Sequence, residues 1–228
     1  MGTTINLSAS DGTNFSAYKA KPAGTPRGAV VVIQEIFGVN AHIRSVADCY
    51  AQEGYVAIAP ALFDRTEAGV ELDYDADGVE KGKTLAFAMS MDTVMLDVEA
   101  AVDAAAMGPN GAQKVGIVGY CWGGSICYVA AARLPKKIAA ASGYYGGQIM
   151  PHLESRPEAP LILHFGEEDH GIPLTDVDAI AGAHPHVAVH VYDGAGHGFN
   201  CDARGGFDED AAATALGRTL AHFAEYVG

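Results

Sequence analysis

Basic residues are scarce in this 228-residue chain. Lys and Arg number 14 against 28 Asp and Glu, which gives a formal net charge of −14 at pH 7. Nucleic-acid backbones and anionic membranes attract basic surfaces, so we expect neither as a partner. Long apolar runs are missing as well, since no stretch approaches the roughly 18 residues of a membrane span.

Cysteines are few, and none forms a C-x-x-C pair of the kind that redox proteins use. The four are Cys49, Cys121, Cys127 and Cys201. The first residues, MGTTINLSAS, contain neither the basic segment nor the apolar segment of a secretory signal, and Asn6 stands where myristoylation needs Ser or Thr. We therefore expect a cytoplasmic protein with reduced thiols.

The overall composition is that of a globular protein. Hydrophobic residues make up 49% of the chain and charged residues 18%. A chain of this length buries enough surface to fold without disulfides or a metal. We expect one domain over residues 1–228, present as a monomer, with a weak dimer as the alternative.

Hydrophobic patterning predicts an α/β fold. Residues 61–90 are acidic and poor in large apolar side chains, and they predict a loop with a short helix. The other strands and helices alternate, which indicates a mostly parallel sheet with helices on both faces, preceded by an antiparallel hairpin. The predicted strands span 3–8, 13–20, 29–35, 55–60, 114–120, 138–146, 159–169 (with its loop) and 187–194, and the predicted helices span 41–53, 91–107, 121–134, 174–183 and 208–226.

A candidate nucleophile lies in residues 119–124 (GYCWGG), between a predicted strand and a predicted helix. The pattern G-x-nucleophile-x-G at a strand–helix turn is the nucleophile elbow of α/β-hydrolases, with Cys121 in the nucleophile position. A helix N-terminus favours a thiolate, and the N–H of Trp122 is the expected first oxyanion donor. The alternative is that Cys121 is a small buried hydrophobic residue in a glycine-rich turn.

The predicted partners of Cys121 follow two later strands. Asp169 ends the GEED loop (166–169), and an acid there can orient a histidine; Glu167 and Glu168 compete for the role but are expected to be solvated. His197 lies between glycines in GAGHGF (194–199). The chain order of nucleophile, acid and base is that of the α/β-hydrolases.

Other histidines suggest a metal site but do not complete one. His184, His186 and His190 lie near one another in the sequence, and no Cys, Asp or Glu adds a convincing ligand. His164 lies within a predicted strand, where we expect an interior histidine. We predict no metal and no cofactor.

With these motifs the chain resembles the dienelactone hydrolase (carboxymethylenebutenolidase) family over nearly its whole length. The resemblance rests on QEIFG (34–38), GYCWGG (119–124), YYG (144–146), GEED (166–169) and GAGHGF (194–199). It implies cofactor-free hydrolysis of a cyclic enol ester, in which the thiolate opens the ring, an enolate leaves, and water hydrolyses the thioester. We therefore expect a small-molecule ester or lactone as substrate. The resemblance also implies that Glu35 is the glutamate beside the cysteine, which keeps the resting thiol neutral and takes its proton when substrate arrives, and that Ile36 supplies the second oxyanion N–H.

The substrate-binding residues depart from the family pattern. Family members acting on dienelactone hold its carboxylate with arginines, one of them four residues after the catalytic histidine. Here Cys201 occupies that position and Arg204 follows three residues later; the upstream arginine region offers lysines instead, which lack the bidentate fork. The candidate substrate-binding residues are Phe37, Lys81, Lys83, Tyr144, Tyr145, Cys201 and Arg204. Packing at a strand end is the alternative for the two tyrosines.

Two other functions stay open on the sequence. A thiol redox protein would pair Cys121 with Cys127 or Cys201. A binding module would use the same scaffold without catalysis.

Overall fold

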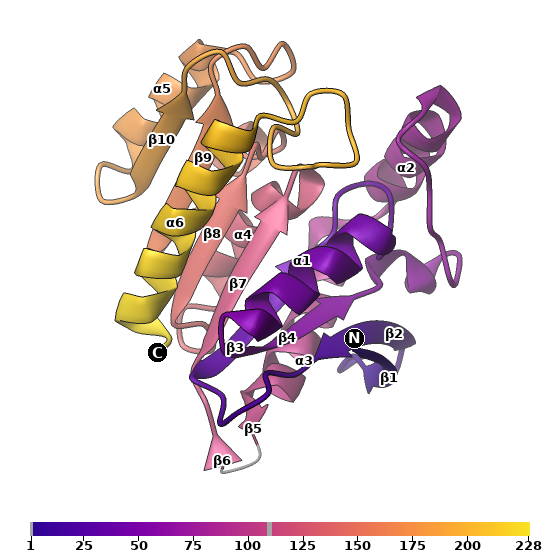
Figure 1. The fold of residues 1–228 in the computed structure, drawn as a ribbon. Coiled ribbons are helices and arrows are strands. Elements are labelled where there is room, and N and C mark those ends of the chain that lie inside the picture. The colour runs from indigo at the N-terminus through magenta and orange to yellow at the C-terminus, as the bar shows by residue number, and fades with distance from the viewer. Residues whose placement is uncertain (1, 109–110) are drawn as a thin grey trace.

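A computed structural model describes residues 2–108 and 111–228. Within these ranges, eight strands form one sheet in the order β1-β2-β4-β3-β7-β8-β9-β10 (Figure 1). Strands β4, β3, β7, β8, β9 and β10 pair in parallel, and the β1–β2 hairpin adds to β4 in antiparallel fashion. The strands are β1 (Thr3–Ser8), β2 (Asn14–Ala20), β3 (Gly28–Ile33), β4 (Tyr55–Pro60), β7 (Val115–Tyr120), β8 (Ala140–Tyr144), β9 (Leu161–Gly166) and β10 (Ala188–Tyr192), and a separate short pair comprises β5 (Met107–Gly108) and β6 (Gly111–Ala112).

Helices cover both faces of the sheet. In Figure 1, α1 and α6 lie on the near face, and α3 and α4 lie on the far face. The helices are α1 (Ala41–Gln52), α2 (Ala76–Ala88), α3 (Met91–Ala106), α4 (Trp122–Arg133), α5 (Leu174–Ala183) and α6 (Glu209–Tyr226), with 3₁₀ turns at Leu62–Arg65 and Met150–His152. Every residue of β3, β4, β7 and β9 is buried, which explains their nearly continuous apolar sequences. The predicted α/β class and N-terminal hairpin are confirmed.

The prediction for residues 61–90 was only partly right. The segment contains a 3₁₀ turn and then α2, a helix of 13 residues and not a short one. Asp75 starts this helix by accepting a hydrogen bond from the N–H of Gly78 at 2.8 Å. A Cβ on Gly82 would lie 2.1 Å from the carbonyl oxygen of Ile36, so α2 packs backbone against backbone. The buried residues of α2 are small, namely Gly78, Gly82 and Ala86. Its sequence therefore lacks the periodic large apolar residues from which a helix is predicted.

An ion pair fixes the 3₁₀ turn at Leu62–Arg65 to α3. Arg65 donates to both carboxylate oxygens of Asp97, at 2.7 and 2.8 Å, and also to Asp11 in the β1–β2 turn. The Asp97 side chain is fully buried. Burial raises the pKa of Asp97 even though Arg65 lowers it, so desolvation exceeds the attraction.

We expect Arg65→Ala to lower the free energy of unfolding by about 3–5 kcal/mol, because it leaves the buried Asp97 carboxylate unpaired. Urea denaturation measures this change. Arg133→Ala is the matched control, since it breaks an exposed pair with Asp92 and costs about 1 kcal/mol or less. A loss in Arg65→Ala as small as that of the control would contradict a stabilising role for the pair.

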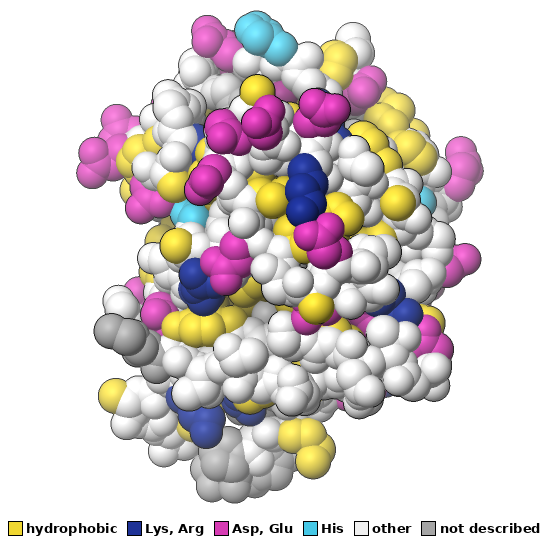
Figure 2. Space-filling model, turned by 90° about the vertical axis from the view of Figure 1, so that its right-hand side faces the viewer, with side chains coloured by type: hydrophobic (Ala, Val, Ile, Leu, Met, Phe, Trp, Pro, Cys, Tyr) yellow, Lys and Arg dark blue, Asp and Glu magenta, His cyan; other side chains and the backbone are white. Residues whose placement is uncertain are grey.

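The surface reflects the acidic composition. Figure 2 shows acidic side chains gathered over the upper part of one face, with Lys and Arg scattered. No helix in the described ranges is long and apolar enough to span a membrane.

Candidate active site

The candidate residues meet at the carboxyl edge of the parallel strands. Glu35 follows β3, Cys121 follows β7, Asp169 follows β9 and His197 follows β10. In an open α/β sheet this edge is where ligands bind. Residues far apart in the sequence therefore meet here because their strands run in parallel.

Cys121 occupies a strained turn between β7 and α4. Its φ is 55° and its ψ is −116°, and non-glycine residues rarely adopt such a positive φ. The turn fits because its neighbours lack side chains. A Cβ on Gly119 would lie 2.2 Å from the carbonyl oxygen of Gly123, and one on Gly124 would lie 2.4 Å from that of Tyr144. The geometry is that of a nucleophile elbow.

His197 contacts both of its predicted partners. Its Nε2 lies 3.2 Å from Cys121 Sγ, and its Nδ1 lies 2.7 Å from Asp169 Oδ2. The Asp169 side chain is fully buried and accepts a further hydrogen bond from the N–H of Gly171 at 2.8 Å. Its competitor Glu167 is exposed and instead accepts from the N–H of Gly194. Asp169 is therefore the acid that can orient the imidazole.

The surroundings of His197 favour its charged form. Burial lowers the pKa of His197, but hydrogen bonds to Asp169 and Cys121 outweigh burial and raise that pKa to about 10. The Tyr145 ring packs against the imidazole with 5.2 Å between ring centroids. The imidazole is thus held by a carboxylate on one nitrogen and by an aromatic ring on its face.

Glu35 is fully buried, and its carboxylate has two partners. Tyr74 Oη donates to Oε2 at 2.9 Å, and the Arg204 guanidinium lies 3.4 Å from Oε1. Burial and the Glu35 carboxylate raise the pKa of Tyr74, so the phenol keeps its proton and donates. Arg204 also lies over the rings of Phe37 and Tyr74, at 5.8 and 5.6 Å from their centroids. These contacts hold the Arg204 guanidinium beside Glu35.

A cavity of about 670 Å³ opens above Cys121 and His197. Five residues singled out from the sequence for oxyanion or substrate binding line it: Ile36, Trp122, Phe37, Lys83 and Arg204. Several other lining residues were not singled out from the sequence, among them Val79 and Phe87 of α2, Gln148, His170 and Ile172. Only the exposed aromatic Phe87, after the acidic part of 61–90, could have suggested a binding wall.

Comparison with known proteins decides the family. The family model described as "Dienelactone hydrolase family" matches residues 15–227. The chain belongs to the dienelactone hydrolase family. A carboxymethylenebutenolidase of Pseudomonas putida is 36% identical to this chain over 95% of it and 93% of the relative.

Solved structures agree with the family and the fold. A structure from Klebsiella pneumoniae subsp. pneumoniae is 31% identical, with a TM-score of 0.83 over 98% of this chain and 100% of that one. The dienelactone hydrolase of Anabaena variabilis has a TM-score of 0.74 at 18% identity, covering 100% of this chain and 99% of its own, and shows the shared fold.

Several substrate-binding candidates from the family pattern lie elsewhere. Lys81 points away from the cavity and pairs with Glu67 at 2.6 Å. Lys81 and Lys83 are two residues apart on α2, so their side chains project from nearly opposite sides of the helix. Cys201 is fully buried behind Glu35, and burial and the Glu35 carboxylate raise its thiol pKa to about 11. Neither side chain is placed to hold a substrate in this cavity.

The two tyrosines also pack inside this dienelactone hydrolase family member. Both are fully buried. Tyr144 Oη bonds to Thr219 of α6 at 2.8 Å, so it belongs to the core. Tyr145 supports His197, and its hydroxyl has no partner among the residues described. Strand-end packing, the alternative that the sequence left open, describes Tyr144.

The redox alternative gains no support from the other thiols. All four cysteines are free, and Cys127 and Cys201 are fully buried. A buried thiol meets neither a redox partner nor a small oxidant readily.

Proposed function

We propose that this family member is a hydrolase that opens a lactone or cleaves a small activated carboxylic ester, with Cys121 as the nucleophile. The contact of His197 with both Cys121 and Asp169, beneath a cavity, carries the proposal. A nucleophile, a base and an orienting acid within hydrogen-bond reach are what covalent ester hydrolysis requires. Asp169 orients His197 and stabilises its cation.

The reaction proceeds in two steps. Glu35 takes the proton of the Cys121 thiol, the His197 imidazolium stabilises the thiolate through Nε2, and Sγ attacks the carbonyl carbon. The N–H groups of Ile36 and Trp122 stabilise the oxyanion that forms. The ester C–O bond then breaks, and the leaving alkoxide or enolate takes the proton of the His197 imidazolium. His197, now neutral, deprotonates a water that hydrolyses the thioester, and the proton held by Glu35 returns to Sγ to regenerate the thiol.

Glu35 acts beside this machinery. As the resemblance implies, it keeps the resting thiol neutral and takes its proton when substrate binds. The ion pair between Glu35 and Arg204 can open when substrate binds, which supports this role. The 3.4 Å separation is long for an ion pair, and the Arg204 side chain is partly exposed. A substrate anion that draws Arg204 away would leave Glu35 free to act.

The cavity favours a substrate that is partly apolar and carries an anionic group. Ile36, Phe37, Val79 and Phe87 supply the apolar wall. Arg204 is the guanidinium in the cavity, and it can bind a carboxylate through two parallel hydrogen bonds. Dienelactone, a lactone with a carboxylate, has these properties, and related proteins are named carboxymethylenebutenolidases.

The test compares a dienelactone with p-nitrophenyl acetate, which has no carboxylate. We expect wild type to hydrolyse both. Arg204→Gln should raise KM for the dienelactone about 10- to 100-fold, because a charge-assisted pair contributes about 1.5–3 kcal/mol. KM for p-nitrophenyl acetate should change little. Steady-state kinetics on both substrates measure the two effects.

Lys81→Gln is the matched control, since Lys81 lies outside the cavity. It should leave both substrates unaffected. Hydrolysis of neither substrate by wild type would reject the proposed function. An equal effect of Arg204→Gln on both substrates would reject the carboxylate-binding role alone.

A further inference from the structure

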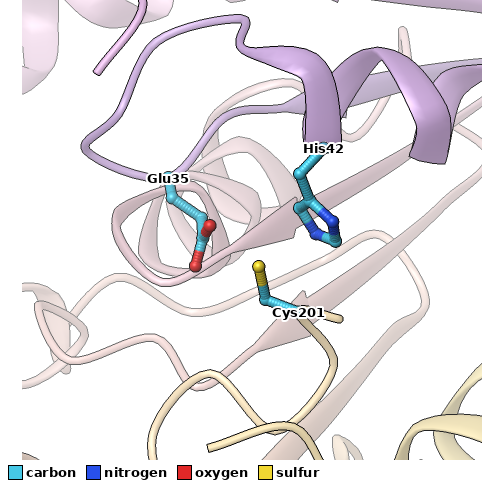
Figure 3. Close-up of side chains that lie close together, drawn as sticks. All are labelled: Glu35, His42 and Cys201. Atoms are coloured by element: carbon cyan, nitrogen blue, oxygen red, sulfur yellow. The ribbon is translucent and has the colours of Figure 1, made fainter. Parts of the chain in front are cut away.

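Three potential metal ligands converge behind the active site. Glu35 comes from the loop after β3, His42 from the first turn of α1, and Cys201 from the loop before α6 (Figure 3). One ligand atom of each lies within 4.8 Å of the others, and all three residues are buried. Among the described residues, this is the group of Cys, His and acidic side chains that comes close enough to hold an ion.

His42 is arranged as a metal-binding histidine usually is. Its Nδ1 lies 3.0 Å from Asp202 Oδ1, so the proton sits on Nδ1 and the lone pair on Nε2. Nε2 is buried and has no hydrogen-bond partner in the part of the chain that the structure describes. An unpaired buried nitrogen costs free energy. In zinc sites, a carboxylate commonly holds one imidazole nitrogen of the histidine while the other nitrogen binds the metal.

We propose that Glu35, His42 and Cys201 form a binding site for a zinc-class divalent cation, with Asp202 orienting His42. The mixture of thiolate, imidazole and carboxylate suits Zn²⁺ and disfavours Mg²⁺ and Ca²⁺, which prefer oxygen ligands. Binding replaces the thiol proton of Cys201, which passes to solvent, and forms a bond from Sγ to the metal. Metal binding is tested independently of the proposed hydrolysis, but a cation bound to Glu35 would prevent its carboxylate from taking the Cys121 proton.

The geometry needs only small side-chain shifts. Because the ligand atoms lie within 4.8 Å of one another, one point lies within about 2.8 Å of all three. Zinc bonds are about 2.0–2.3 Å, so each ligand atom moves inward by about 0.5–0.8 Å. Two contacts compete, Tyr74 Oη at 2.9 Å and Arg204 at 3.4 Å from the Glu35 oxygens. The long Arg204 contact is the one that the cation displaces.

Cobalt spectroscopy on the full chain tests the site. Chelator-treated protein is titrated with Co²⁺, whose bond to a thiolate gives a charge-transfer band in the near ultraviolet. We expect the band in wild type and in Cys121→Ser, its loss in Cys201→Ser, and its disappearance when Zn²⁺ is added. No band in wild type overturns the proposal, as does a band that survives Cys201→Ser.

Asp202→Asn tests the orienting role without disturbing the core, because the Asp202 side chain is 73% exposed. We expect Co²⁺ affinity to fall about 10- to 100-fold, as it does when the carboxylate that holds a metal-binding histidine is changed. Unchanged affinity in this variant overturns the part of the proposal in which Asp202 orients His42 for the metal. The variant also keeps the proposal testable if Cys201→Ser fails to fold.

Discussion

Cys121→Ala is expected to lower kcat/KM for p-nitrophenyl acetate by about 10⁴-fold or more, because the proposed mechanism has no substitute nucleophile. The fold should survive, since the strain in the elbow lies in the backbone and alanine fits where cysteine stood. Stopped assays with purified protein measure the loss, and circular dichroism checks the fold. The Cys121 side chain is partly exposed at the cavity, so the change removes reactivity and little packing.

Cys121→Ser tests whether catalysis needs the thiol or whether a hydroxyl at the same position is sufficient. The hydroxyl is a poorer nucleophile than a thiolate beside a base placed for sulfur, so we expect it to keep the fold and lose most activity. Cys127→Ala is the matched control and should remain active, because Cys127 is buried within α4. Full turnover by Cys121→Ser would reject the thiol-specific mechanism. Loss of activity in both Cys127→Ala and Cys121→Ala would favour a two-thiol role.

Asp169→Asn is expected to lower kcat by about 10⁴-fold, because an amide cannot stabilise the imidazolium and favours the wrong tautomer. The 2.7 Å contact with His197 is the interaction that is lost. Glu167→Gln is the control, since Glu167 lies in the same loop, is exposed and keeps an oxygen for the N–H of Gly194. An Asp169→Asn enzyme as fast as the control would reject Asp169 as the orienting acid.

We also expect Asp169→Asn to change how the free energy of unfolding depends on pH. The folded-state pKa of His197, about 10, lies above the ordinary value of 6.5. The resulting stabilisation is therefore complete below pH about 6.5 and disappears as pH rises through about 10. Asp169→Asn should lower the His197 pKa, measured by NMR titration. Its deficit in the free energy of unfolding should be greatest below pH about 6.5 and smallest near pH 10.

Local patterns in the sequence were sufficient for the elements that the core dictates. Continuous apolar runs predicted the buried strands β3, β4, β7 and β9, because a strand covered on both faces tolerates few polar residues. The turn at 119–124 was also predicted from the sequence. Its glycines are required because a side chain there would collide with neighbouring backbone atoms. Chain order then fixed which acid and which histidine follow the nucleophile.

The sequence determined the α/β sheet and the positions of Cys121, Asp169 and His197 at strand ends, because these depend on short-range periodicity and turn chemistry. Only the tertiary structure decided that Arg204 and Lys83 enter the cavity while Lys81 and Cys201 do not. It alone brought Glu35, His42 and Cys201 together from three separate segments. A side chain's direction in a loop depends on contacts with residues distant in the sequence, and no local pattern encodes them.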